Sequence, residues 1–375
     1  MPTVGEVAAL LDGLWPPDWA EPWDNVGLLA GDRTAPVRRC LCALDADSRN
    51  VAAAAAAGAE LLVSHHPLPF RPLRRLLAQD PVGAGLLLAA SRGVALYAAH
   101  TNLDVHPAGV SQALAAALGL EGAEVLRVTG REVLHKLVVF VPGGHEEAVL
   151  DALAGAGAGH LGRYSHCSFA ALGTGTFRPL AGAQPFVGRI GTLERQAESR
   201  LEVLVPDRSR EAAIAAMLRA HPYEEVAFDL IRLENAGPAR GLGVVGTLAR
   251  PLPLASFAAT VARRLHAPAA RYAGDPRRLV QRVAVCGGAG AELAEEARAA
   301  RAEVLVTADV RYHEARAMEA MGLGLVDPGH QATELPVVPL MADALRAALR
   351  QAGAEVEVAL ESDPPDVWRR VGGAG

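Results

Sequence analysis

The segment RRCLCALDADSRNVAAAAAAGAELLVSHH, residues 38–66, decides the fold class of this chain. It passes from one apolar stretch through an aspartate-containing turn and an alanine-rich stretch to a second apolar stretch. This pattern predicts a β-α-β unit, in which a helix crosses over between two parallel strands. The second strand ends abruptly at His65 and His66, so the fold would place both imidazole rings at a strand end.

The same pattern occurs again near the C-terminus. Residues 281–309, QRVAVCGGAGAELAEEARAARAEVLVTAD, align with residues 38–66 without a gap. Residues 321–334, MGLGLVDPGHQATE, resemble residues 92–104, RGVALYAAHTNLD, with one inserted residue, and both end in a His-x-x-x-acid motif. We therefore expect an α/β protein with duplicated half-domains, whose equivalent loops lie beyond the strand ends, where open α/β sheets bind ligands.

A different pattern separates the two copies. Residues 136–153, KLVVFVPGGHEEAVLDAL, and 200–218, RLEVLVPDRSREAAIAAML, each predict a strand, a turn and a helix, and HPYEEVAFDLIRL, residues 221–233, predicts a closing strand. Two such repeats predict a ferredoxin-like α+β domain. The expected organisation is a discontinuous α/β domain, residues 1–130 and 237–375, with a smaller domain inserted at residues 131–236.

Composition excludes several functional classes. The net charge of −6, with no block of like charges, argues against nucleic-acid binding. The N-terminus lacks a secretory pattern, and no apolar segment reaches the roughly 18 residues needed to cross a membrane. The four cysteines match neither a disulfide scaffold nor a zinc ribbon. We expect a cytoplasmic protein without membrane association.

The histidines and acids at the predicted strand ends suggest a metal centre. Neutral imidazole is the commonest metal ligand, and carboxylates complete sites for divalent ions. The candidate ligands are His65, His66 and Asp104 from the first copy with His330 and Glu334 from the second. Five donors exceed what one tetrahedral ion needs, so two ions sharing a carboxylate are predicted. The alternative is that these residues only cap strand ends and the following helix.

Other polar residues leave two readings open. His100, Asp309 and His313 could orient metal ligands, or Asp309 could simply end its strand. The turn Trp23-Asp24-Asn25 could line the cavity or be structural, and CGGAG, residues 286–290, fits a tight turn better than a phosphate loop. Glu224 and Glu225 could bind a cation in the inserted domain or form a solvated pair.

Five segments together carry a family resemblance: EPWDNVGLLAGD (21–32), VSHHPLPF (63–70), AAHTNLD (98–104), VLVTADVRYHEA (304–315) and DPGHQATE (327–334). In this order they resemble the Nif-three-like dinuclear metal-centre hexamer family, often labelled GTP cyclohydrolase 1 type 2 homologs. The likeness covers nearly the whole chain, and the insert resembles the PII and CutA-like domain of the longer bacterial members. The chain departs from the family pattern at Ala308, Pro328 and Gln331.

The resemblance implies a two-metal centre at the same five residues and a homohexameric ring around an internal cavity. Two divalent ions, two carboxylates and neutral histidines would leave a net charge of about +2, which attracts a small anionic substrate or ligand. The N/O donor set admits Zn, Fe, Mn, Co or Ni. We expect a metal-dependent hydrolase, with GTP ring opening suggested by the family label; the alternative is a metal-dependent regulator or scaffold without turnover.

Overall fold

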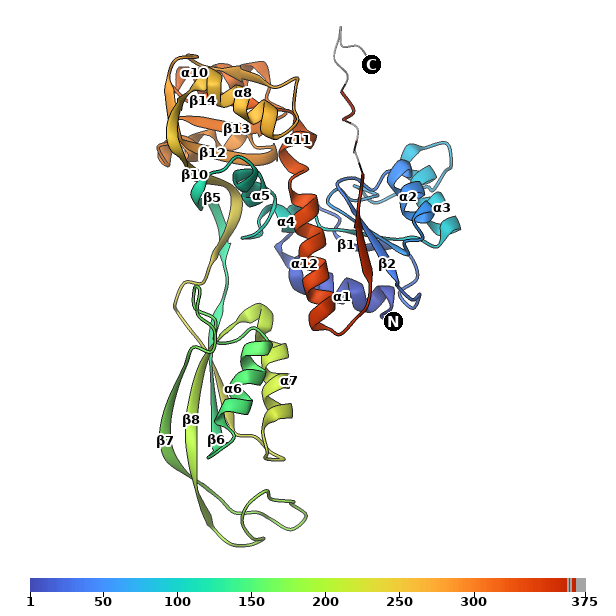
Figure 1. The fold of residues 1–375 in the computed structure, drawn as a ribbon. Coiled ribbons are helices and arrows are strands. Elements are labelled where there is room, and N and C mark those ends of the chain that lie inside the picture. The colour runs from blue at the N-terminus through green and yellow to red at the C-terminus, as the bar shows by residue number, and fades with distance from the viewer. Residues whose placement is uncertain (363, 365, 369–375) are drawn as a thin grey trace. The chain divides into compact units, whose positions relative to one another are not determined.

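The computed structural model describes residues 1–362, 364 and 366–368 of the chain (Figure 1). The chain divides into two compact units, one formed by Gly130–Ala239 and the other by Met1–Thr129 together with the chain from Arg240 onward. The insertion predicted at residues 131–236 falls inside the smaller unit. Among the described residues, no helix combines the length and apolar character that crossing a lipid bilayer requires.

The first sequence copy forms a five-stranded sheet in the order β1-β4-β3-β2-β15. Its strands are β1 (Gly27–Ala30), β2 (Arg39–Ala43), β3 (Leu61–Ser64), β4 (Ala95–Ala98) and β15 (Glu357–Leu360). β15, β2, β3 and β4 are parallel, whereas β1 pairs antiparallel with β4. The crossover helices are α2 (Ser48–Ala56) and α3 (Pro81–Arg92), and the Asp47 carboxylate caps α2 by accepting from the Asn50 amide.

The second copy forms its own six-stranded sheet in the order β11-β14-β13-β12-β10-β5. Its strands are β5 (Glu121–Arg131), β10 (Ala239–Pro253), β11 (Arg271–Ala273), β12 (Leu279–Ala289), β13 (Val304–Ala308) and β14 (Gly324–Asp327). β12, β13 and β14 are parallel, like β2, β3 and β4. Their crossovers contain η3 (Ala291–Leu293) with α9 (Ala294–Ala299), and α10 (Tyr312–Ala320). The predicted mixed α/β architecture is confirmed, with one sheet for each copy.

Helices cover both faces of each sheet because the buried strands are apolar on both sides. On the first sheet, α1 (Val4–Leu14) and α12 (Val337–Gln351) share one core, and α2 and α3 share the other (Figure 1). On the second sheet, α5 (Val110–Ala117) and α8 (Leu254–Arg264) pack on one face, and α9 and α10 pack on the other. Three short helices complete this unit: η1 (Pro17–Trp19), α4 (Thr101–Asp104) and α11 (His330–Glu334).

Because the side chains of β3 are buried, shortening one of them should lower the stability of the first sheet. Leu62 is fully buried between the sheet and its covering helices, whereas Leu87 on α3 is 38% exposed. We expect Leu62→Ala to lower the free energy of unfolding by about 2–5 kcal/mol, because it removes buried methyl groups and leaves a cavity. Leu87→Ala is the control and should cost much less. Denaturant unfolding of both variants measures the difference; equal losses would contradict this packing.

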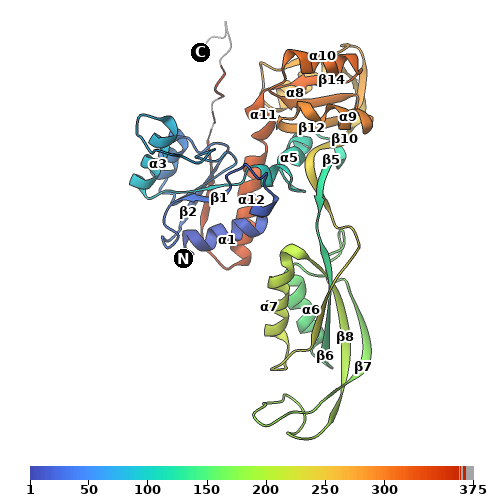
Figure 2. The same cartoon turned by 180° about the vertical axis from the view of Figure 1, so that it is seen from behind.

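The smaller unit is a four-stranded antiparallel sheet in the order β7-β8-β6-β9. Its elements in chain order are β6 (Leu134–Pro142), α6 (Glu146–Gly155), β7 (Ser168–Phe177), β8 (Glu194–Pro206), η2 (Asp207–Ser209), α7 (Arg210–Ala220) and β9 (Phe228–Arg232). Both helices lie on the same face of the sheet (Figures 1 and 2), where they share an apolar core with β6 and β8.

Candidate metal centre

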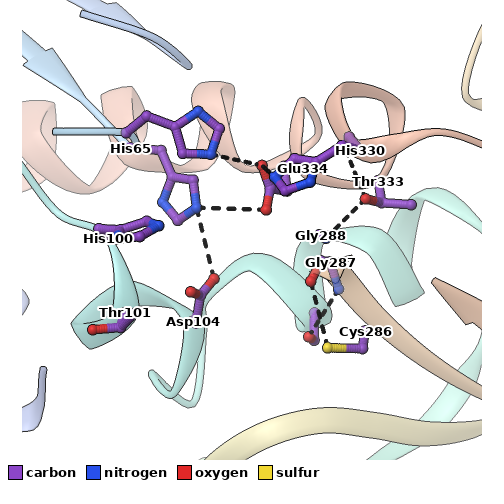
Figure 3. A network of polar contacts seen from close by, with 12 residues as sticks. His65, His100, Thr101, Asp104, Cys286, Gly287, Gly288, His330, Thr333 and Glu334 are labelled. Atoms are coloured by element: carbon purple, nitrogen blue, oxygen red, sulfur yellow. Dashed lines mark hydrogen bonds and ion pairs between the residues drawn. The ribbon is translucent and has the colours of Figure 1, made fainter. Parts of the chain in front are cut away.

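All five predicted ligands converge at the carboxyl ends of β3 and of the equivalent region of the second copy. His65 and His66 directly follow β3, and Asp104 is the last residue of α4. His330 and Glu334 begin and end α11, so one helical turn places both side chains on the same face. Figure 3 shows His65, Asp104, His330 and Glu334 facing a common point.

The Glu334 carboxylate lies at the middle of this cluster. Its Oε2 is 3.0 Å from His66 Nε2 and 3.1 Å from His330 Nε2. Its Oε1 is 3.9 Å from His65 Nε2, which is 3.7 Å from Asp104 Oδ1. The side chain of Glu334 is only 5% exposed, so a carboxylate from the second copy is buried among histidines from the first.

Two buried atoms of the cluster have no hydrogen bond of acceptable geometry: His65 Nε2 and Glu334 Oε2. Buried polar atoms without a partner are costly and therefore rare in folded proteins. Here the nitrogen and the oxygen belong to side chains that lie within 4 Å of one another around Glu334, as the ligands of a shared cation do. The residues present therefore fit a bound divalent metal.

Within the described part of the chain, two trios of donor atoms are close enough to hold an ion. His65, His66 and His100 form one, and His66, His330 and Glu334 form the other, with all donor atoms of a trio within 4.8 Å of one another. His100 was expected only to orient ligands, but the structure places it among the donors. Asp104 stands outside both trios, next to His65. The shared His66 joins the two groups.

In each histidine of the cluster, Nδ1 forms a hydrogen bond with an oxygen atom of a residue that lies outside the cluster. Such partners fix the ring orientation and leave Nε2 for a metal. The four pairs, with Nδ1 to oxygen distances, are His65 with the Ala99 carbonyl (2.8 Å), His66 with Asp45 (2.8 Å), His100 with Asp24 (2.9 Å) and His330 with Asp309 (2.7 Å). Asp309 thus holds the orienting position predicted for it. The Asp45 contact was missed, and the one available signal was its position just after β2.

His313 and Asn25 do not share this arrangement. His313 lies on α10 with its ring 5.3 Å from that of Tyr312. The Asn25 side-chain amide donates to the Pro69 carbonyl at 2.7 Å, which is a structural role in the loop after β3.

The Asp309 contact with His330 can be tested by removing one charge. Asp309 has a φ of 54°, a left-handed conformation that asparagine also tolerates, so Asp309→Asn should keep the backbone. We expect this variant to bind divalent metal about 10–100-fold more weakly, because His330 loses its anionic partner. Equilibrium dialysis against buffered metal measures the change. Asp343→Asn, whose side chain is 75% exposed on α12, is the control and should bind like the parent protein.

The surroundings shift the pKa values of the histidines in opposite directions. Burial lowers the pKa of His65 to about 3, so this ring is neutral and ready to bind metal at neutral pH. For His66, burial is outweighed by its contacts with Asp45 and Glu334, which raise its pKa to about 10. The Glu334 carboxylate raises the pKa of His330 to about 9. In the metal-free protein His66 and His330 therefore carry protons at pH 7.

The pKa values of the two carboxyl groups, Glu334 and Asp104, are also shifted in opposite directions. Burial acts against the charged form of Glu334, but contacts with His330 and His66 hold its pKa well below the usual range. Burial and the nearby Glu334 charge raise the pKa of Asp104 well above its usual range. In the metal-free centre Glu334 thus carries the negative charge, and Asp104 becomes a stronger ligand once cations replace the protons.

The CGGAG segment has a packing role at this centre. Gly288 has a φ of +63°, and a Cβ at this position would lie 2.3 Å from Glu334 Oε1. Its amide donates to Thr333 Oγ1 at 2.9 Å, and its carbonyl accepts from Thr307 Oγ1 at 2.9 Å. The glycine therefore lets α11 approach the end of β12 closely enough to place the Glu334 carboxylate.

Aromatic side chains border the cluster at His100. Trp23 is 56% exposed, and its ring lies 6.2 Å from His100 and 5.7 Å from Phe70. The Phe70 ring is 5.6 Å from His100. Asp24, next to Trp23, accepts from the Thr101 amide and hydroxyl as well as contacting His100. The Trp23-Asp24-Asn25 turn thus both supports a histidine and presents an exposed ring beside it.

Comparison with known proteins extends over almost the entire chain. A Mycobacterium tuberculosis protein named GTP cyclohydrolase 1 type 2 homolog is 42% identical over 369 residues, covering 97% of this chain and 96% of that protein. A Halalkalibacterium halodurans protein of the same name is 41% identical over 332 residues, covering 88% and 89%. The crystal structure of a Bacillus cereus protein related to NIF3 has 39% identity and a TM-score of 0.86, with 99% of each chain covered.

The family resemblance carried by the five sequence segments is therefore confirmed. Residues 2–365 match the family described as Duf34/NIF3 (NGG1p interacting factor 3). The chain belongs to the Duf34/NIF3 family.

Proposed function

We propose that the protein is a dinuclear metal-dependent hydrolase. The observation that carries this proposal is the buried Glu334 carboxylate, whose Oε2 lies 3.0 Å from His66 Nε2 and 3.1 Å from His330 Nε2, so imidazole nitrogens from both sequence copies surround it. The five residues His65, His66, Asp104, His330 and Glu334 would hold two divalent ions, with His100 as a further donor. When bound, such ions lower the pKa of water and stabilise a developing oxyanion.

The chain's own residues support this chemistry by positioning and by charge. Asp45 and Asp309 hold the His66 and His330 rings so that Nε2 faces the centre. Two ions with the Asp104 and Glu334 carboxylates leave about +2, which favours an anionic small molecule. The donor set of nitrogen and oxygen suits Zn, Fe, Mn, Co or Ni.

The exposed rings beside His100 favour a substrate with a planar group. Trp23 and Phe70 offer apolar faces next to the donor cluster, and a flat heterocycle could pack on them while its anionic part approaches the metals. A nucleotide has both parts, whereas a related cyclic amide has only the planar one. The relatives named GTP cyclohydrolase 1 type 2 homolog agree with this substrate class.

A regulatory or scaffold function is the second candidate, because the donors come from both sequence copies. Ions bound by His66 from the first copy and Glu334 from the second would tie the two sheets together and stabilise the fold. Under this proposal the chain forms a homohexameric ring. The smaller unit would be a PII or CutA-like ferredoxin fold, and its antiparallel order β7-β8-β6-β9 supports that assignment.

One comparison separates the two candidates. Metal-loaded protein and a His65→Ala, His66→Ala double variant are assayed against GTP, phosphoesters and cyclic amides, with His160→Ala, His166→Ala in the smaller unit as the control. Metal-dependent turnover that only the first variant loses supports the hydrolase. No turnover in the parent protein, together with a lower melting temperature and an intact oligomer in the first variant, supports the scaffold.

A further inference from the structure

The smaller unit contains a cavity of its own, unconnected with the proposed chemistry of the metal centre. Its volume is about 580 Å³, and all of its lining residues belong to Gly130–Ala239. A cavity of roughly 300–1,000 Å³ with apolar walls and few polar groups is typical of small-molecule sites. Most of the lining side chains here are aliphatic or aromatic, and the few charged ones are mainly acidic.

Aromatic rings form one side of this cavity. Tyr223 lies at the centre of the group, with its ring 6.3 Å from Phe177 and 6.1 Å from Phe186. The Tyr223 amide donates to His221 Nδ1 at 3.1 Å, which anchors the main chain at this residue. Phe186 is 57% exposed, so an apolar face remains for a ligand to cover.

The largely buried residue Glu198 contributes a carboxylate to the lining of the cavity. Glu198 on β8 is only 8% exposed, and its Oε1 accepts from the Tyr223 hydroxyl at 3.0 Å. The other oxygen, Oε2, has no hydrogen bond or ion pair with another described residue, and it is accessible rather than enclosed. A Cβ at position 175 would lie 2.1 Å from Oε2, so Gly175 on the neighbouring strand makes room for this group. The accessible oxygen can therefore pair with a cation that enters the cavity.

The remaining charges set the sign of that partner. Glu224 and Glu225 also line the cavity, against one guanidinium, Arg178, so the ionised groups leave two negative charges. Glu224 Oε1 accepts from the Gln184 amide at 2.8 Å and anchors the loop that carries Phe186. An anion would meet repulsion, and a bare metal ion would find mostly carbon around it. An alkylated ammonium, by contrast, is attracted by aromatic faces and by a carboxylate.

The geometry points to a binding site for a small organic cation in the inserted unit, with Glu198 as its counter-ion and Tyr223, Phe177 and Phe186 as its aromatic wall. Glu224 and Glu225 increase the negative potential at the same cavity. This assignment gives the acidic pair of the HPYEE segment a role that does not depend on the metal centre.

The test uses three probes of one shape and different charge on the full-length protein. Choline, its neutral carbon isostere dimethylbutanol and the anion dimethylbutanoate are titrated by saturation-transfer NMR. We expect choline to bind at least about tenfold more tightly than the neutral isostere, and the anion to bind least. Glu198→Gln keeps the size of the side chain and should weaken choline binding about tenfold or more. Phe186→Ala, at a position that is 57% exposed, should weaken it as well.

Glu147→Gln on the exposed side of α6 is the matched control and should bind choline like the parent protein. Circular dichroism and thermal melting of each variant establish that the unit is folded. Equal binding of choline and dimethylbutanol, tighter binding of the anion, no binding of choline to the parent protein, or unchanged binding in folded Glu198→Gln would each overturn the proposal. None of these outcomes bears on metal content, so the hydrolase proposal is tested separately.

Discussion

Glu334→Gln should lower the affinity for divalent metal by more than about a hundredfold, beyond the loss expected for an outer partner. The substitution keeps the shape of the side chain but removes the negative charge that lies 3.0 Å from His66 and 3.1 Å from His330. A neutral amide is a weaker ligand than the carboxylate in the trio of His66, His330 and Glu334, and its NH₂ group repels a cation. Metal content after dialysis against buffered metal, measured by elemental analysis, gives the effect.

Any hydrolytic turnover of Glu334→Gln should fall in proportion to its loss of bound metal. Glu355→Gln, at an exposed position near the C-terminal strand of the first sheet, is the control that changes the same charge away from the centre. It should keep full metal content and full turnover. A Glu334→Gln variant that binds metal as tightly as the parent protein would show that this carboxylate is not a ligand.

Metal binding at pH 7 should release at least two protons for each chain, and the affinity should fall at least about a hundredfold for each unit of pH below 7. The protons come from His66, whose pKa is about 10, and His330, whose pKa is about 9, because a histidine must be neutral to bind metal, and from Asp104, whose pKa is raised well above its usual range. Titration calorimetry in buffers of different ionisation enthalpy counts the protons. Binding without proton release would contradict the proposed roles of both rings.

The same pKa values fix how the metal-free protein responds to pH. A histidine whose pKa is raised on folding stabilises the folded state fully below about pH 6.5, its unfolded value. The contributions of His66 and His330 should therefore be lost as the pH rises through about 9 to 10. Glu334, whose pKa is lowered, contributes above its unfolded value of about 4.5, and this contribution is lost in acid. Unfolding curves of metal-free protein across this range check both signs.

The sequence was sufficient to bring the five predicted residues together because each follows a strand of a repeated unit. The apolar run before His65 and His66 predicted a buried strand, and the duplicated His-x-x-x-acid motif placed His330 and Glu334 beyond the equivalent region. Periodicity and repetition thus predicted which ends of the chain meet. They also predicted the mixed α/β architecture.

Sequence reasoning did not place His100 among the donors, and the reason is local geometry. His100 and Asp104 lie one helical turn apart at the start and end of α4, and only the path of the chain decides which one faces His65 more closely. The Asp24 contact that orients His100 joins residues far apart in the sequence, so no local pattern reports it. Gly288 was recognised as part of a turn, but its closeness to Glu334 depends on tertiary packing.

The most direct test is an anomalous diffraction map of crystals grown with excess Mn²⁺ or Zn²⁺. The account predicts two peaks in each chain, about 3.5–4 Å apart as in other two-metal sites, bounded by His65, His66, Asp104, His330 and Glu334. A map with no peak at this cluster, or with the ions bound elsewhere while these side chains contact only one another, would contradict it.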